Sequence, residues 1–119
     1  MKYYITHKIE GSEGGNTVEI TKDTFTVGRH GDLATPLGLN CVSRLHFGIF
    51  RHRDGCYIRD LNSHCGTRVK SKSEDGMRSY EVLDANIGNP SGEVKLRNGD
   101  EISIGIDARP KILLTFTTS

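Results

Sequence analysis

Three short segments of the chain carry residues that could bind an anion. Gly28-Arg29 follows a predicted strand, Ser43-Arg44 ends the loop after it, and Ser63-His64-Cys65-Gly66 follows a later strand. Arginine offers a planar fork of N–H donors and serine adds a hydroxyl, which together suit an oxyanion with several acceptor oxygens. A phosphate on a protein side chain fits best, since it carries about −1.5 to −2 charges at pH 7 and three acceptor oxygens. These residues therefore indicate a phosphate site where the segments converge at one rim of the fold.

The elements that must position these residues are short β-strands separated by turns. No stretch of the sequence shows the apolar spacing of an amphipathic helix, and 14 glycines are spread along the chain. Runs of β-branched or aromatic residues followed by turn residues predict strands at Tyr3–Ile9, Val18–Thr21, Thr24–Gly28, Leu45–His52, Cys56–Asp60, Thr67–Lys70, Tyr80–Leu83, Glu93–Leu96, Glu101–Ile104 and Lys111–Thr117. So many short strands in one small domain predict an all-β sandwich or barrel.

The turn residues support this interpretation. Asn98-Gly99 predicts a two-residue hairpin between Val94–Leu96 and Ile102–Ile104, and Arg53-Asp54-Gly55 predicts another before Cys56–Asp60. Residues 71–76 and 86–92 are rich in polar residues or in Gly, Asn and Pro, which is typical of long surface loops.

Length and composition favour a single cytoplasmic domain, residues 1–119. Sixteen basic against fifteen acidic residues give a formal net charge of +1, which provides no general attraction to nucleic acid or to an acidic membrane. No apolar run is long enough to span a membrane, and the first residues lack a secretion signal. Cys41, Cys56 and Cys65 are odd in number and lack CxxC spacing, so we expect reduced thiols and no zinc site.

Four motifs in order resemble the forkhead-associated (FHA) domain family. They are Gly28-Arg29, Ser43-Arg44-Leu45-His46, the Asp-Leu-x-Ser-x-x-Gly-Thr pattern of residues 60–67, and Leu-Arg-Asn-Gly-Asp-Glu-Ile-x-Ile-Gly at residues 96–105. The resemblance runs from about Phe25 to Gly105 and implies a two-sheet sandwich of ten or eleven strands, of SMAD/FHA-like type. It also implies a recognition module that binds phosphothreonine-containing proteins, the substrates of a Ser/Thr kinase. Catalysis, a cofactor and a metal are not implied.

The resemblance assigns roles to individual residues. Arg29 and Ser43 match positions that contact the phosphate, Arg44 matches a position that touches phosphate or peptide, and His64 stands where the family often has a residue able to meet the phosphate. Cys65 stands at a peptide-contact position. His46 matches the histidine that braces the binding loops without usually touching the ligand. Other structural positions are matched by Gly28, Gly66, Thr67, Gly99 and Asp100.

Two positions depart from the family pattern. The family usually has Asn at the position of Cys65, where the amide bonds the peptide main chain, and a thiol is a poor substitute. A further family Asn is replaced by Lys70. We therefore predict binding that is weak, with micromolar affinity of about −8 kcal/mol, and still dependent on phosphate. Affinity should fall below about pH 6 as the phosphate takes up a proton, and protonation of His64 would partly offset that fall.

Three other functions fit parts of the sequence. An FHA-like scaffold could bind proteins without phosphate; Cys65 and Lys70, which replace family Asn residues, would then reflect loss of the phosphopeptide-binding function. A single-strand nucleic-acid binder is suggested by the charge of +3 over residues 29–53, but residues 29–46 contain no aromatic side chain for base stacking. Cys65 beside His64 could be a nucleophile, although adjacent residues in a loop rarely point at each other.

Overall fold

The computed structural model describes residues 1–9, 15–34, 44–61, 66–72, 78–83, 93–104 and 112–119, with only the backbone of Ile9, Ala34, Lys72 and Arg78–Leu83. These residues form strands β1 (Tyr3–Ile9), β2 (Asn16–Glu19), β3 (Thr24–Gly28), β4 (Leu33–Ala34), β5 (Phe47–His52), β6 (Gly55–Asp60), β7 (Thr67–Lys72), β8 (Arg78–Leu83), β9 (Glu93–Lys95), β10 (Glu101–Ile104) and β11 (Ile112–Thr118). Among the residues described, none forms a helix with the length and apolar character that a bilayer crossing requires.

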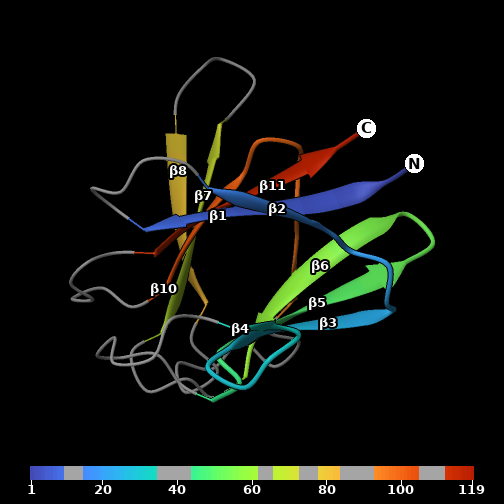
Figure 1. Ribbon diagram of the computed structural model, residues 1–119. Coiled ribbons are helices and arrows are strands. Elements are labelled where there is room, and N and C mark those ends of the chain that lie inside the picture. Colours follow the sequence, from blue (N-terminus) through green and yellow to red (C-terminus); the bar gives the residue numbers. More distant parts are fainter. Residues whose placement is uncertain (10–14, 35–43, 62–65, 73–77, 84–92, 105–111) are drawn as a thin grey trace.

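The strands lie in two sheets that face each other (Figure 1). The six-stranded sheet has the order β2-β1-β11-β10-β7-β8, and the five-stranded sheet has the order β4-β3-β5-β6-β9. Pairing is antiparallel except between β3 and β4, which run parallel. The predicted two-sheet sandwich of ten or eleven strands is confirmed. Strands β1, β2 and β11, which flank the stretch that resembles the FHA family, form one half of the six-stranded sheet.

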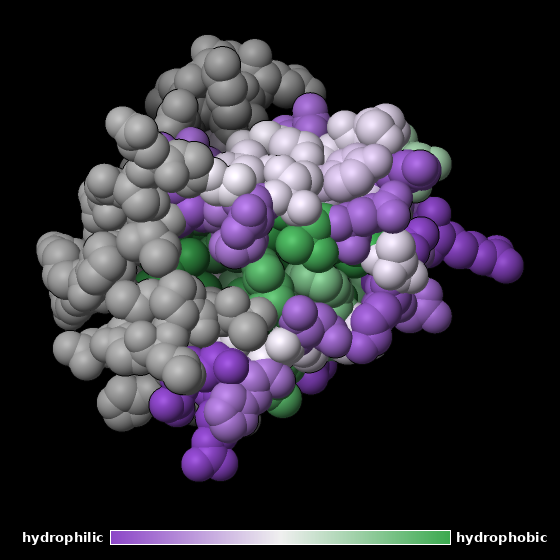
Figure 2. Space-filling view, in the orientation of Figure 1, coloured by the Kyte–Doolittle hydropathy of each residue, from purple (hydrophilic) through white to green (hydrophobic). Residues whose placement is uncertain are grey.

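The core fills the space between the two sheets because alternate side chains of each strand point inward. On β11, Ile112, Leu114 and Phe116 are almost fully buried, whereas Leu113 between them is 38% exposed. On the opposite sheet Phe47, Ile49 and other alternate residues complete one hydrophobic cluster. Figure 2 shows apolar residues along the seam between the sheets and polar residues over the layers on either side. Full burial of such a side chain stabilises the fold by about 1.5–3 kcal/mol.

The hairpin predicted at Arg53-Asp54-Gly55 is confirmed, and the one predicted at Asn98-Gly99 is wrong. His52 pairs with Gly55, so a two-residue turn joins β5 to β6. Asn98-Gly99 instead carries the chain from β9 in one sheet to β10 in the other. The Asp100 N–H donates to the Arg97 carbonyl at 3.0 Å, and Gly99 has φ = 91°. A positive φ at the third position is typical of a type II turn, which does not follow the twist of a hairpin.

Two segments predicted as loops contain strand residues. Leu33–Ala34 form β4, which lies inside the loop expected over residues 30–43 and pairs with Val27 and Gly28 of β3. Ser71 and Lys72 extend β7 into the loop expected over residues 71–76, because they pair with Ser79 and Arg78 of β8. Residues 86–92, the other predicted loop, lie outside the described part of the chain.

Candidate functional site

Three crossings of the chain meet at one end of the sandwich. The His46 N–H donates to the carbonyl of Val27 at 2.7 Å, which extends the pairing of β3 and β5 toward that end. The Leu61 N–H donates to the carbonyl of His46 at 3.0 Å, which does the same for β5 and β6. The end of β3, the segment before β5 and the end of β6 are therefore neighbours, and each carries one of the sequence motifs.

Arg29 lies in a tight turn directly after β3. The Gly31 N–H donates to the Gly28 carbonyl at 3.2 Å, which puts Arg29 and His30 at the two central positions of the turn. Both residues are exposed, whereas Gly28 is buried. Arg29 is therefore presented to solvent by a short piece of backbone whose two ends are joined.

Arg44 is joined to the same turn through the main chain. The His30 N–H donates to the Arg44 carbonyl at 2.9 Å, and Arg44 is exposed. The structure thus brings together the backbones of Arg29 and Arg44, two of the residues that the sequence assigns to phosphate binding. Ser43, His64 and Cys65, the others assigned to phosphate or peptide contact, lie outside the described residues.

His46 is buried beneath this end of the sandwich. Its side chain is fully buried, and its Nε2 atom lies 2.7 Å from the carbonyl oxygen of Gly66. Because a carbonyl oxygen only accepts hydrogen bonds, Nε2 carries the proton in this contact. Burial lowers the pKa of His46, and the bond to Gly66 and the nearby Asp60 carboxylate oppose that shift. The imidazole is therefore held in its neutral form.

A second buried contact joins β6 to β7. The Thr67 hydroxyl donates to Oδ1 of Asp60 at 2.7 Å, and both residues are buried. Gly66, which precedes Thr67, has φ = 82°, a left-handed conformation that glycine adopts at little cost. These contacts fix the backbone on both sides of residues 62–65, the segment that contains His64 and Cys65.

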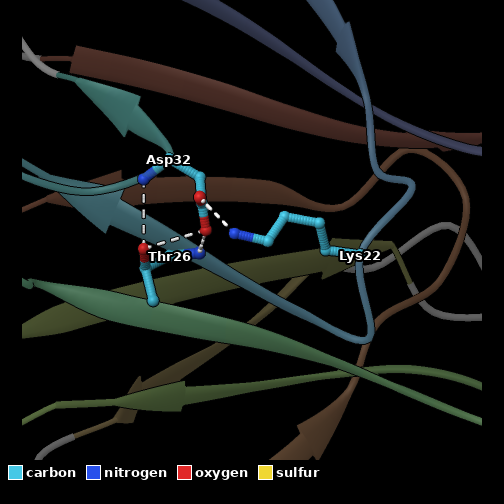
Figure 3. Close-up of polar contacts among 3 residues, drawn as sticks. All are labelled: Lys22, Thr26 and Asp32. Carbon is cyan, nitrogen blue, oxygen red and sulfur yellow. Dashed lines mark hydrogen bonds and ion pairs between the residues drawn. The ribbon is translucent and has the colours of Figure 1, made fainter.

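Hydrogen bonds between Asp32 and Thr26 fasten the Arg29 turn to β3, and Asp32 also pairs with the exposed Lys22; these contacts were not predicted from the sequence (Figure 3). Oδ2 of Asp32 accepts from the Thr26 N–H at 2.9 Å and from the Thr26 hydroxyl at 3.1 Å, and Oδ1 accepts from Nζ of Lys22 at 2.7 Å. The bonds from Lys22 and from the Thr26 N–H lower the pKa of Asp32. The one available signal was that Asp32 is the sole acid in residues 29–53.

The basic residues of segment 29–53 do not form one patch. Arg29 and Arg44 lie at the end where β3 finishes and β5 begins, whereas Arg51 and Arg53 lie at the far end of β5. A strand of six residues separates the two groups by about 20 Å. Arg51 is also engaged, because its Nη1 donates to the carbonyl of Thr21 and its guanidinium lies over the Tyr3 ring. A continuous basic stripe of the kind that single-stranded nucleic acid follows is thus not formed by these residues.

The part of the chain that the structure describes offers no metal site. It contains no group of three or more His, Cys, Asp or Glu side chains that could hold an ion. Cys56 is a free thiol in the core, and burial raises its pKa to about 11. Cys41 and Cys65 lie outside the described residues.

Comparisons with known proteins point to one family. The family model described as FHA domain matches residues 25–105. No curated protein sequence matches. The fold is similar to the FHA domain of CT664 from Chlamydia trachomatis (16% identity, TM-score 0.63, 100% of this chain and 99% of that one). It is also similar to the FHA domain of an Arabidopsis thaliana hypothetical protein (24% identity, TM-score 0.66, 99% of this chain and 87% of that one). A third similar structure is the FHA domain of human APLF in complex with an XRCC1 bisphospho peptide (19% identity, TM-score 0.65, 97% of this chain and 98% of that one).

Proposed function

The chain belongs to the FHA domain family, and on that premise we propose that it binds proteins phosphorylated on threonine, which are the substrates of a Ser/Thr kinase. The observation that carries the proposal is the hydrogen bond from the His30 N–H to the Arg44 carbonyl at 2.9 Å, because it places two exposed arginines on adjacent backbone segments. The family membership supports the same function, and the APLF domain, which shares this fold, is bound to a bisphospho peptide.

Arg29 and Arg44 are the proposed phosphate ligands. Each guanidinium can donate two parallel N–H bonds to phosphate oxygens, and a hydrogen bond to a charged group contributes about 1.5–3 kcal/mol. Ser43, which precedes Arg44, adds a hydroxyl donor, and His64 adds an imidazole. Cys65 occupies the peptide-contact position, where a thiol bonds the peptide main chain only weakly. Together these contacts give micromolar affinity after the cost of ordering the peptide.

The supporting residues keep the backbone of the site in place. Gly28 begins the Arg29 turn, and the buried ring of His46 bonds the carbonyl of Gly66. Thr67 bonds the buried Asp60 carboxylate. In this proposal these residues do not touch the ligand, and their replacement would weaken binding through the position of the loops.

The proposed activity is recognition without catalysis, cofactor or metal, in the cytoplasm. FHA domains are recognition modules, and a recognition site needs donors of fixed geometry rather than a nucleophile and a base. We propose that residues 1–119 form one such domain. This is supported by β1, β2 and β11, which lie outside the matched stretch and complete the six-stranded sheet.

Titration with a matched pair of peptides tests the proposal. A phosphothreonine peptide, chosen from a degenerate library, and its unphosphorylated copy are titrated into the full chain by calorimetry. We expect a micromolar Kd for the phosphopeptide and a Kd weaker by a factor of about 100 for the copy, as loss of two charge-assisted contacts requires. Equal affinities would instead identify a scaffold that does not depend on phosphate, and binding of an oligonucleotide at low salt would revive the nucleic-acid alternative.

A pair of arginine variants locates the site. Arg29→Ala should weaken phosphopeptide binding at least about tenfold, because it removes a charge-assisted contact. Arg53→Ala is the matched control, since Arg53 is also exposed and lies in the turn at the opposite end of β5. Its phosphopeptide Kd should stay within twofold of the unmodified chain. Similar losses in both variants would show that general charge, rather than the Arg29 turn, attracts the peptide.

A further inference from the structure

The turn that carries Arg29 is short, exposed and held on both of its sides. On one side the His30 N–H bonds the Arg44 carbonyl at 2.9 Å. On the other side the chain returns to β3 through Gly31 and Asp32 and pairs in parallel with Val27 and Gly28. Arg29 stands between these two attachments, so its position depends on both of them.

The attachment through Asp32 consists of three hydrogen bonds with a single residue of β3 (Figure 3). Oδ2 of Asp32 accepts from the Thr26 N–H at 2.9 Å and from the Thr26 hydroxyl at 3.1 Å, and the Asp32 N–H donates back to the Thr26 hydroxyl oxygen at 3.0 Å. Parallel pairing with β4 begins only at Val27. The Asp32 carboxylate therefore occupies the place on the edge of β3 that a neighbouring strand would otherwise take.

The backbone of Gly31, between the turn and Asp32, also lies close to β3. A Cβ atom on Gly31 would be 2.8 Å from the carbonyl oxygen of Thr26 and 3.0 Å from the nitrogen of Gly28, so only glycine allows this approach. Because Gly31 packs against the strand between Asp32 and the turn, we expect a displacement of Asp32 to move the turn. The bond from Nζ of Lys22 to the other carboxylate oxygen, at 2.7 Å, lies on the solvent side, where Lys22 is 62% exposed.

We propose that Asp32 is a positioning residue for phosphate recognition: its carboxylate, bonded to the backbone and hydroxyl of Thr26, sets the place of the Arg29 turn beside Arg44. This inference rests on the proposed function and adds a specific requirement to it. The requirement is for a carboxylate, because Oδ2 accepts two hydrogen bonds from Thr26 and a charged oxygen accepts them more strongly than an amide oxygen does. An asparagine would bond Thr26 through a neutral oxygen, and the other orientation of its amide would place an NH₂ group against the Thr26 N–H.

Phosphopeptide affinity in matched variants tests the proposal. Each variant is measured at a temperature where circular dichroism shows it folded. Asp32→Asn should weaken the phosphopeptide Kd about tenfold, because a misplaced guanidinium loses a charge-assisted bond. Lys22→Met, which removes only the exposed ion pair, should change it less than twofold. Thr26→Val should weaken phosphopeptide binding, whereas Thr26→Ser, which keeps the hydroxyl, should bind as tightly as the unmodified chain.

A double-mutant cycle separates positioning from a merely structural role. If Asp32 acts through Arg29, Asp32→Asn should weaken the phosphopeptide Kd less than about twofold when Arg29→Lys is already present, although Asp32→Asn alone weakens it about tenfold. A role in stability alone would lower the melting temperature of Asp32→Asn and leave its Kd within twofold. Either that result or equal losses in the two backgrounds would overturn the proposal.

Amide hydrogen exchange keeps the test independent of the proposed function. If the unmodified chain binds the phosphorylated and unphosphorylated peptides equally, the proposed function fails, and with it the link to phosphate. The effect of Asp32 on the turn is still measured, because Asp32→Asn should speed exchange of the His30 N–H at least about tenfold and Lys22→Met should not. Unchanged exchange in Asp32→Asn would show that the carboxylate does not hold the turn.

Discussion

The Nε2 atom of His46 bonds the carbonyl oxygen of Gly66 at 2.7 Å, while the carbonyl of the same histidine accepts from the Leu61 N–H at 3.0 Å. Leu61 and Gly66 flank residues 62–65, so one buried residue of the segment before β5 anchors both ends of a segment between β6 and β7. The main chain of His46 also donates to Val27, directly before Gly28 and Arg29. A single histidine thus joins the backbones of all three crossings that meet at the proposed phosphate site.

Replacement of His46 should lower both stability and phosphopeptide affinity. His46→Leu removes the donor and leaves the Gly66 carbonyl without this bond, which should lower the free energy of unfolding by about 1–3 kcal/mol. His46→Gln should lose less, because its amide can still donate. The control is His52→Leu at the far end of β5, where the side chain is 48% exposed and its Nε2 lies 3.5 Å from a carboxylate oxygen of Glu93; we expect a change within about 0.5 kcal/mol. Urea unfolding and peptide titration of the three variants would contradict this role if His46→Leu matched His52→Leu.

The stability of the fold should fall as the pH drops below neutral, in part because of His46. Burial lowers the pKa of His46 from its ordinary value of 6.5, so the unfolded chain binds this proton more readily than the folded protein. The contribution of His46 to stability is therefore complete above pH 6.5 and is lost as the pH falls from 6.5 through the lower folded-state pKa. Asp32 contributes to stability over a different pH range. Its pKa is lowered from 3.8, so its contribution to stability is lost only as the pH falls from about 3.8 through that lower pKa.

His46→Gln isolates this effect from the other titrating groups. Glutamine keeps a donor for Gly66 and does not titrate, so the free energy of unfolding should change less between pH 7.5 and pH 5 in the variant than in the unmodified chain. Urea unfolding at several pH values measures both slopes, and the remaining histidines contribute equally to each. Parallel slopes would show that the His46 imidazole takes up its proton as easily in the fold as in the unfolded chain.

Much of this fold is predictable from local sequence patterns, because each strand is short and half-buried. Thr24–Gly28 and Glu101–Ile104 are predicted with the bounds that the structure has, since apolar and polar residues alternate along them. β4 has no such pattern: Leu33–Ala34 is too short, and parallel pairing with β3 forms it. Asn98-Gly99 does form a turn as predicted, but which sheet receives the next strand depends on packing with β11, where the Gly99 N–H bonds the Phe116 carbonyl.

The sequence predicts that Arg29 and Arg44 lie at the same end of the fold, but it does not predict the contacts that support the Arg29 turn. Arg29 follows one strand and Arg44 precedes the next, which predicts that they lie at the same end of the sandwich. In the structure, the His30 N–H bonds the Arg44 carbonyl at that end. The role of Asp32 is not visible in the sequence, because its partners Thr26 and Lys22 lie six and ten residues earlier and no local rule pairs them. The charge of +3 over residues 29–53 misleads for a related reason: an extended strand separates residues that are close in sequence.

Cys56 should resist thiol reagents as long as the protein is folded. Its side chain is fully buried and burial raises its pKa to about 11, so at pH 8 the thiolate is scarce and the reagent has no access. Alkylation with iodoacetamide followed by mass spectrometry should leave Cys56 unmodified in buffer and modify it fully in urea. Cys56→Ala is the control for assigning the peptide. Modification of Cys56 in buffer at the rate seen in urea would show that this part of the core opens readily.

Two glycines with the same backbone strain allow stability and recognition to be separated. Gly66 and Gly99 have φ values of 82° and 91°, and in both cases a Cβ atom would meet nothing within 4 Å among the described residues. Alanine at either position should therefore lower the free energy of unfolding by a similar amount, about 1–2 kcal/mol, through the left-handed backbone alone.

The effects of these two substitutions on binding should differ. Gly66 carries the carbonyl that His46 bonds and directly follows His64 and Cys65, whereas Gly99 lies at the opposite end of the sandwich, where its N–H bonds the Phe116 carbonyl. Gly66→Ala should weaken the phosphopeptide Kd about tenfold, because alanine disfavours a positive φ and the backbone at residue 66, directly after the proposed peptide-contact position, shifts as a result; Gly99→Ala should leave the Kd within twofold. Equal Kd values for two variants of equal stability would mean that the segment before Gly66 does not contact the peptide.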